Sequence, residues 1–524
     1  MRHQTTFIHA LGAAMLGAGL LSACGGGAGA SSTPAAAPPV VIPIPPVVTV
    51  GPAWTSYGGD AQHRSQAAVA TQALNRILWQ APVDLVPVYS NGGALLTHYG
   101  SPVITAQNTV ILPVKTGATT GFRFEGRSGS SGALLWSATS DYVMPAHRWI
   151  PSYNVTLTAT NRVYAAGAGG KVYFRDNADS ATAPTQTSAF YGDAVYSANK
   201  ASLDTDVHIN TPVTADSSGN IYFGFTATTG NAAGLAGGIA RIGADGKGSW
   251  ASASALTLGA ATKLAMNSAP AVSSDGKTLY IVVNNDQAQG YIVSLDSTTL
   301  ALASRTRLMD PARGTPAGIS DDSTASPTVG PDGDVYIGVL ETAFGEHNGR
   351  GWLLHFDRTL NQEKLPGSFG WDDTPSIVPA SMVPSYKGSA SYLIMTKYNN
   401  YARGLGDGQN KLAVLDPNTQ QADPYSDVKV MQEVLTVLGP TPDPGYYGGV
   451  TEWCINVAAV DPFTKSILAN SEDGYLYRWD MATNTLSQRI KLTNGLGESY
   501  TPTLVGPDGV VYAINNGVLF AVGK

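Results

Sequence analysis

Residues 326–339 have the sequence SPTVGPDGDVYIGV, and residues 501–514 have the closely similar sequence TPTLVGPDGVVYAI. In both stretches a short apolar segment after proline is followed by Asp-Gly and then by an apolar run that contains Tyr. Asp-Gly between apolar alternations is a β-hairpin signal. Each stretch is therefore predicted to form two antiparallel strands, and a later apolar segment such as WLLHFD (352–357) would add a third.

The same unit recurs along most of the chain, usually with a Pro-x-apolar start. Its copies begin at residues 102, 151, 212, 270, 327, 375, 457 and 502. Units of about 45–50 residues that supply four short strands each are typical of β-propeller blades. A row of separate sandwiches is excluded, because no unit alone could bury both of its faces. We therefore predict an all-β fold, an eight-bladed β-propeller.

The eighth unit is too short to complete a blade. After Pro502 it has room for only two further strands, GVVYAI (509–514) and GVLFAV (517–522), before the chain ends at Lys524. The segment NRILWQAP (75–82) reads as an edge strand near the other end of the domain. We expect the two terminal strands to pair, because pairing closes the ring and removes free sheet edges.

Composition narrows the class of protein further. The chain has 524 residues, of which 43% are hydrophobic and 13% are charged, and its net charge is −7. The hydrophobic share excludes global disorder, and the lack of a basic patch argues against a nucleic-acid partner. We expect a monomer.

The first residues have the order of a secretory signal. Arg2 precedes an apolar run over 7–21, which is followed by Leu-Ser-Ala-Cys at 21–24. This ending resembles a bacterial lipoprotein box, which implies cleavage before Cys24 and acylation of that residue, for example with palmitate. The alternative is a plain signal peptide with an incidental cysteine. Gly25 resembles the second residue of lipoproteins sent to the outer membrane, so we expect a lipid anchor there, with the protein facing the periplasm.

Three regions are predicted on this basis. Residues 1–23 would be the signal peptide, residues 24–51 the lipidated cysteine with a Gly/Ala/Pro-rich tether, and residues 52–524 a single propeller domain. With Cys24 acylated, Cys454 is the one remaining cysteine, so no disulfide within the chain is expected.

Two further motifs carry a family resemblance. Residues 54–63 read WTSYGGDAQH and residues 131–136 read SGALLW. They are similar to the N-terminal W-x-x-x-G-G-D-x-x-H stretch and the blade endings of quinoprotein-alcohol-dehydrogenase-like propellers. Catalytic members of that family hold pyrroloquinoline quinone against a disulfide between adjacent cysteines, with Ca²⁺ bound by Glu and Asn and an Asp base. This chain has no adjacent cysteines, so its organisation looks more like the non-catalytic members, which include the propeller lipoprotein of the outer-membrane β-barrel assembly machinery.

Candidate site residues come from aligning the eight units. The fourth position before each start is expected at one mouth of the central channel, and there the chain carries His98, His147, His208, Met266, Ser323, Trp371, Trp453 and Glu498. Converging imidazoles suit Zn²⁺ or Cu²⁺, so His98, His147 and His208 are a candidate metal site. The nearby acids Asp322, Asp372, Asp373, Glu452 and Glu498 could bind Ca²⁺. Alternatively, these are solvated side chains around a ring too wide for coordination.

Aromatic and charged side chains at the same mouth suggest a ligand rim. Its candidate members are Arg148, Trp149, Trp371, Trp453 and Glu498. The alternative for the tryptophans is packing between blades.

The longest interval between units is a further candidate for function. Residues 428–438 (VKVMQEVLTVL) are predicted to form a short amphipathic helix, and the loop 439–449 would act as a lid or a partner-docking loop or be inert decoration.

Two functions follow from these observations. The first is a non-catalytic, outer-membrane-tethered periplasmic propeller lipoprotein that acts as a scaffold and binds protein or envelope ligands, with an outer-membrane protein as its partner. The second is a periplasmic oxidoreductase with a quinone or metal in the propeller mouth. Glycan binding is a more distant third.

Overall fold

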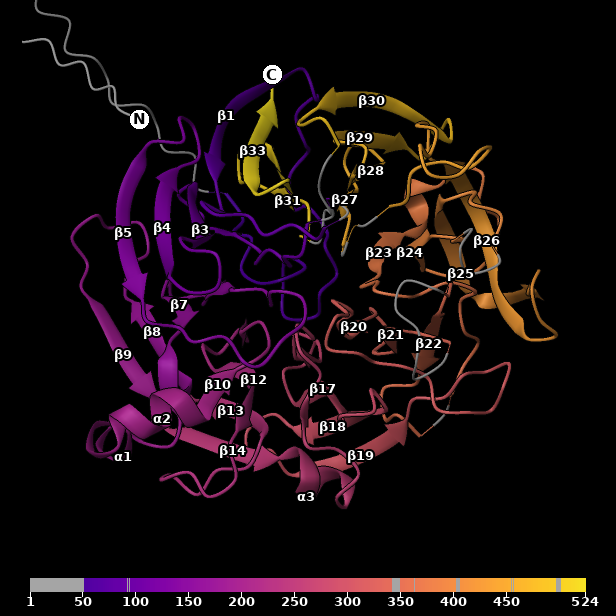
Figure 1. Ribbon diagram of the computed structural model, residues 1–524. Coiled ribbons are helices and arrows are strands. Elements are labelled where there is room, and N and C mark those ends of the chain that lie inside the picture. The colour runs from indigo at the N-terminus through magenta and orange to yellow at the C-terminus, as the bar shows by residue number, and fades with distance from the viewer. Residues whose placement is uncertain are drawn as a thin grey trace, which may run out of the picture. The chain divides into compact units, whose positions relative to one another are not determined.

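The computed structural model describes residues 51–91, 93, 95–341, 349–361, 363–401, 406–453, 455, 457–495 and 501–524. Eight small antiparallel sheets are arranged as blades around a central axis (Figure 1). This confirms the predicted all-β, eight-bladed propeller.

The first four blades each contain four or five strands, numbered outward from the axis. Blade 1 contains β2 (Val103–Ile104), β3 (Thr109–Lys115), β4 (Phe122–Ser128) and β5 (Leu134–Ser140). Blade 2 contains β6 (Val155–Leu157), β7 (Val163–Ala166), β8 (Lys171–Arg175) and β9 (Thr185–Ala189). Blade 3 contains β10 (Val207–Ile209), β11 (Thr214–Ala215), β12 (Ile221–Ala227), β13 (Gly238–Ile242) and β14 (Gly248–Ser252). Blade 4 contains β15 (Lys263–Leu264), β16 (Ala271–Val272), β17 (Thr278–Asn284), β18 (Gly290–Asp296) and β19 (Leu302–Arg307).

The last four blades follow the same plan. Blade 5 contains β20 (Thr328–Val329), β21 (Val335–Val339) and β22 (Trp352–Phe356). Blade 6 contains β23 (Ser376–Pro379), β24 (Tyr392–Tyr398), β25 (Lys411–Ala422) and β26 (Lys429–Leu438). Blade 7 contains β27 (Ala459–Asp461), β28 (Ser466–Asn470), β29 (Tyr475–Asp480) and β30 (Thr485–Lys491). Blade 8 contains β31 (Leu504–Val505), β32 (Val511–Asn515), β33 (Val518–Gly523) and, as its outermost strand, β1 (Arg76–Pro82).

Short helices occur only between strands in the described part of the chain. They are α1 (Asp193–Ala198), α2 (Lys200–Asp206), α3 (Ala253–Thr257) and the 3₁₀ turns η1 (Ala168–Gly170) and η2 (Ala380–Met382). None of the helices in the described residues is both long enough and apolar enough to span a membrane.

The two ends of the domain close the ring, as predicted. β1 pairs antiparallel with β33, with Ile77 opposite Val522 and Gln80 opposite Phe520, and the two strands lie side by side in Figure 1. Trp79 of β1 is 8% exposed. Its indole N–H donates a 2.7 Å hydrogen bond to the carbonyl of Gly129 in blade 1, so β1 also joins blade 8 to its neighbour.

The tyrosine that recurs in the repeat links each of several blades to the next one. Tyr222, Tyr280 and Tyr512 are buried in the second strands of blades 3, 4 and 8. Their hydroxyls donate to the carbonyls of Ser297, Arg358 and Gly129, at 3.0, 2.7 and 3.3 Å. The tyrosines lie in β12, β17 and β32, and their acceptors follow β18, β22 and β4 of the next blade. The repeated Tyr is therefore a contact between blades.

The predicted helix at 428–438 is wrong. Residues 429–438 form β26, which pairs with the long strand β25, with Val414 opposite Leu435. The β-branched residues Val430, Val434 and Val437 favour a strand, and Val434, Leu435 and Val437 pack between blades 6 and 7. The apolar residues that suggested a helical face therefore serve as the outer strand of blade 6.

We expect Trp79→Ala to weaken closure of the ring. The change removes a buried indole and its hydrogen bond, so the free energy of unfolding should fall by about 3–5 kcal/mol. Leu302→Ala, on the outer strand β19 and 42% exposed, is the matched control and should change it by less than about 0.5 kcal/mol. Urea unfolding followed by near-ultraviolet circular dichroism measures both, and equal effects would contradict the closing role of β1.

Candidate functional site

The innermost strands of all blades run in the same direction along the axis, so the two mouths of the central channel are formed by different sets of loops. We call the loops that precede these strands the leading mouth, and the loops that follow them the plugged mouth. Residues 54–72, named the plug, lie across the second mouth. Backbone hydrogen bonds of 2.7–3.1 Å join the plug to blades 1, 2, 4, 5, 6, 7 and 8, through Ile104, Leu157, Val272, Val329, Ile377, Val460 and Gly509.

The motif that carries the family resemblance forms this plug. Gly58 and Gly59 have positive φ angles of 64° and 89°, and a Cβ on Gly58 would lie 2.8 Å from the Cα of His63. The carboxylate of Asp60 accepts hydrogen bonds from the backbone N–H of Gln62 and of Arg64. The motif therefore folds back on itself as a compact loop and sets the direction in which its side chains point.

Two side chains of the plug point into the protein. The Tyr57 hydroxyl lies 2.9 Å from Oγ1 of Thr374 and donates to the carbonyl of Thr324 at 3.2 Å. Burial raises the pKa of Tyr57 well above its ordinary value, with nearby Asp372 adding to the effect, so the phenol stays neutral. The His63 ring is fully buried, with Nδ1 2.7 Å from the carbonyl of Pro327. Burial lowers the pKa of His63 to about 4.

Asn267 links the loops of several blades at the leading mouth. Its side-chain amide donates to Nδ1 of His98 at 3.1 Å, and its side-chain oxygen accepts from the N–H of Ser152 at 2.9 Å. Its backbone N–H donates to the carbonyl of Asn210, and its amide also reaches the carbonyl of Asp321 at 3.3 Å. One buried residue of blade 4 therefore joins the loops of blades 1, 2 and 5 through its side chain and that of blade 3 through its backbone.

Some predicted site residues do meet beside this amide. His98 is 1% exposed and stacks on Trp149, with ring centroids 5.5 Å apart and planes 12° apart. The exposed guanidinium of Arg148 lies 4.0 Å from the carboxylate of Asp322. These four residues come from the leading loops of blades 1, 2 and 5. They form a half-exposed aromatic and charged patch at the mouth.

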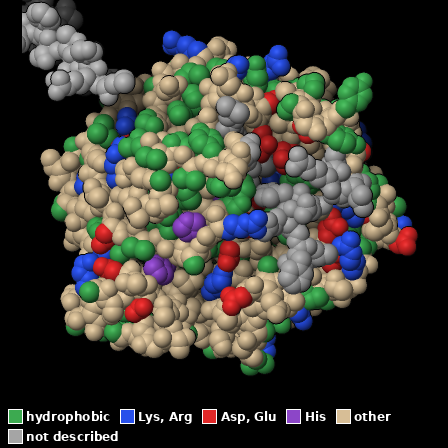
Figure 2. Space-filling model, in the orientation of Figure 1, with side chains coloured by type: hydrophobic (Ala, Val, Ile, Leu, Met, Phe, Trp, Pro, Cys, Tyr) green, Lys and Arg blue, Asp and Glu red, His purple; other side chains and the backbone are tan. Residues whose placement is uncertain are grey.

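The three predicted metal-binding histidines do not converge. His147 is exposed and its Nδ1 lies 2.8 Å from the carbonyl of Pro145, whereas Nε2 of His208 lies 2.9 Å from the carbonyl of Thr205. Within the described residues no group of three or more His, Cys, Asp or Glu side chains could hold a metal ion. The histidine side chains on the face shown in Figure 2 also lie apart. The three histidines stand at the same sequence distance before their inner strands, but the loops that carry them follow different paths, so their side chains do not meet.

Two of the predicted rim tryptophans are interior residues. Trp371 is 2% exposed, and Trp453 is fully buried with its ring 5.6 Å from that of Tyr477. Met266 and Ser323 are also buried. Of the proposed rim, the structure therefore leaves Arg148 and Trp149 at the surface. Glu498, Cys24 and Cys454 lie outside the described residues.

A buried group of charges lies just below the leading mouth. Asp372, Asp373 and Lys397 are each 2% exposed, and Nζ of Lys397 lies 4.0 Å from the Asp372 carboxylate. Burial raises the pKa of Asp373 to about 7, and nearby Asp372 adds to the rise, whereas Lys397 and a 2.6 Å hydrogen bond from Thr396 oppose it. Two of the acids predicted at this mouth, Asp372 and Asp373, therefore do lie close together. The positive charge beside them is that of Lys397.

The residues do not fit the disulfide-backed quinone site that the family resemblance implies. The chain's two cysteines are 24 and 454, so no adjacent pair exists. At the leading mouth Asn267 instead bonds to the loops of four other blades.

Asn267 and Lys397 were not among the site residues predicted from the sequence. Asn267 follows directly after the aligned position of Met266, and its positive φ of 65° is one that Asn adopts more readily than most residues. Lys397 is the next-to-last residue of the mostly apolar strand β24 and carries no local signal. Only the ring arrangement brings these side chains to their partners.

Solved structures with the same fold include two dehydrogenases. A europium-containing methanol dehydrogenase aligns with a TM-score of 0.54 and 8% identity over 88% of this chain and 89% of its own. The quinohemoprotein alcohol dehydrogenase from Comamonas testosteroni aligns at 0.51 and 12%, over 91% of this chain and 82% of its own. This chain has the propeller fold of these proteins, as the resemblance predicted.

A third structure, BamB from Moraxella catarrhalis, aligns at a TM-score of 0.43 and 12% identity, over 86% of this chain and 99% of its own. No protein-family model matches the sequence, and no curated protein matches it either. At these identities the similarities establish the fold and leave activity open.

We expect the plug to make the domain sensitive to acid through His63. The pKa of His63 falls from 6.5 in the unfolded chain to about 4 in the folded one, so the unfolded state binds more protons below pH 6.5. Stability is thus complete above pH 6.5 and should fall by about 3 kcal/mol as the pH drops to 4.

Thermal melting of the wild type and of His63→Gln between pH 8 and pH 4 measures this effect. The variant should melt lower at pH 8, because a hydrogen bond is lost, and should lose less on acidification. His147→Gln, in an exposed loop, should follow the wild-type profile. Parallel profiles for wild type and His63→Gln would contradict the assignment.

Proposed function

We propose that this protein is a non-catalytic propeller lipoprotein, tethered to the outer membrane through Cys24, which binds a protein or another envelope component at its leading mouth. The observation that carries the proposal is the Asn267 network. It joins the leading loops of blades 1, 2, 3 and 5 to blade 4 and leaves Arg148 exposed and Trp149 partly exposed at the surface. A mouth whose loops are joined in this way and that carries a small aromatic and charged patch suits docking.

The place where the described chain begins is compatible with docking at the leading mouth. Gly51, the first described residue, donates its N–H to the carbonyl of Ala106, which follows the innermost strand of blade 1. This first described residue therefore lies on the side of the plugged mouth. A Pro-rich tether of residues 25–51 could reach roughly 80 Å at about 3.1 Å per residue. A domain anchored in this way can turn its leading mouth away from the membrane.

A photo-crosslinking residue placed at position 148 tests the docking site. Expressed in the native host, it should give a discrete crosslinked band with an envelope protein, because Arg148 is 64% exposed at the mouth. The matched control is position 258, where Leu258 is 81% exposed on the outside of the ring. Bands at both positions, or at neither, would contradict docking at this mouth.

The anchor is tested in the same cells. Cys24→Ala should move the protein from the membrane fraction to the soluble fraction and weaken the crosslink at 148. Cys454→Ala should leave both unchanged.

The alternative is a periplasmic oxidoreductase that uses a quinone, Ca²⁺ or a transition metal. The observation that favours it is the pKa of about 7 for Asp373, since acids with strongly shifted pKa values often belong to catalytic sites. An absorbance spectrum and metal analysis of protein purified from its native envelope separate the two functions. We expect no quinone band and less than about 0.1 metal ion per chain, and a stoichiometric cofactor would replace the scaffold proposal.

A further inference from the structure

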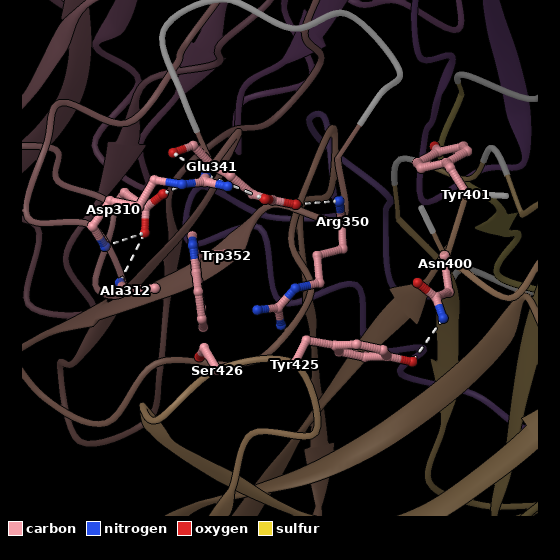
Figure 3. A pocket seen from close by; sticks show the side chains of 11 residues that line it. Asp310, Ala312, Glu341, Arg350, Trp352, Asn400, Tyr401, Tyr425 and Ser426 are labelled. Atoms are coloured by element: carbon pink, nitrogen blue, oxygen red, sulfur yellow. Dashed lines mark hydrogen bonds and ion pairs between the residues drawn. The ribbon is translucent and has the colours of Figure 1, made fainter. Parts of the chain in front are cut away.

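A second concave site lies away from the axis, between blades 5 and 6. It has a volume of about 350 Å³, within the usual range of about 300–1,000 Å³ for small-molecule sites. Figure 3 shows Asp310 and Glu341 on one side of it, Tyr425 and Ser426 on the opposite side, and Arg350 between them. The indole of Trp352 is seen edge-on within the same wall.

The charged side chains in the wall of this site form ion pairs with nearby side chains. Arg313 lies 3.1 Å from the carboxylate of Asp310 and 3.4 Å from that of Glu341. The guanidinium of Arg350 makes two 2.8 Å hydrogen bonds to the carboxylate of Asp423. A strongly charged ligand would have to disrupt these pairs. The wall is therefore suited to a neutral ligand with many hydrogen-bonding groups, because planar carboxylate and guanidinium groups accept from and donate to hydroxyls.

Tyr425 provides an aromatic surface in the site. Its side chain is 50% exposed. The ring is held by a 2.7 Å hydrogen bond from the amide of Asn400 to its hydroxyl and by the guanidinium of Arg350, 5.1 Å from the ring centroid. A ring that is fixed in position and half exposed can stack against the C–H face of a sugar at a small cost in entropy.

The same tyrosine also borders a second cavity. This cavity has a volume of about 330 Å³ and shares Asn400 and Tyr425 with the first. Its charged lining residues are Asp407, Lys411 and Glu433. Acids therefore exceed bases over the two cavities together, which disfavours anionic ligands. Two adjoining cavities with one aromatic residue between them suit a ligand of two or more rings.

We propose that these two cavities bind a neutral saccharide of at least two sugar rings, with Tyr425 as the stacking surface between adjacent subsites. The site uses neither the Asn267 network nor the patch at Arg148 and Trp149, so it is independent of the proposed function. The wall formed by Arg313, Asp310 and Glu341 would hydrogen-bond to the hydroxyls of one ring. The side of Tyr425 toward Lys411 and Glu433 would receive the next ring.

Calorimetric titration of the purified protein tests this site. The probes are maltose, cellobiose and N,N′-diacetylchitobiose, their monosaccharides, and glucuronate and glucose 6-phosphate as anionic controls. At least one neutral disaccharide should bind about tenfold more tightly than its monosaccharide, and Tyr425→Ala should remove about that factor. Tyr425→Phe keeps the ring and should stay within about threefold of the wild type.

Two further variants make the test independent of folding. Arg313→Gln, on the opposite wall and 52% exposed, should weaken the disaccharide at least about threefold. Phe463→Ala, at a 61% exposed aromatic side chain between β27 and β28 of blade 7, should leave binding unchanged. The proposal is overturned if no neutral disaccharide binds, if an anionic probe binds more tightly, or if Tyr425→Ala and Arg313→Gln both bind like the wild type.

Discussion

The free inner edges of the blades are the constraint on which the rest of the structure depends. In every blade the innermost strand has a neighbour on one side only, so its other backbone groups face the axis. Buried N–H groups without a partner are costly. In this chain the plug supplies carbonyl partners, as Ala61 does for the N–H of Val272 and Gln62 for that of Val329. The plug thereby bonds to the innermost strands of six blades and to a turn of blade 8, and it closes one end of the channel.

Contacts of a different kind hold the blades to one another. Buried tyrosines such as Tyr222 and Tyr280 reach a carbonyl in the next blade, and Trp79 does the same between blades 8 and 1. A ring held both at the axis and between neighbours has little freedom to change shape. It is suited to presenting fixed surfaces, such as the patch at Trp149 and the wall around Tyr425.

The parts of the structure that could be predicted from the sequence are those set by local chemistry. Asp-Gly turns and apolar alternation indicated the strands, their repetition indicated eight blades, and the short last unit indicated pairing with residues 75–82. The helix expected at 428–438 was wrong, because an apolar run of this length fits either element. The site was harder to predict. His98 and Trp149 do come together, but His147 and His208 face other partners, because each loop takes its own path into its blade. Asn267 bonds to residues of four other blades, and the sequence of a single repeat gives no sign of these contacts.

The plug also has a consequence for how the chain reaches its native state. It is synthesised before any blade, yet its partners extend as far as Lys524, 452 residues after Gln72. Contacts so distant in sequence are slow to form. The motif at 54–63 must therefore wait until every blade has been made, and the ring stays open at its centre until the C-terminal strands arrive. Truncation anywhere in blade 8 would therefore leave the plug without the last of its hydrogen-bond partners.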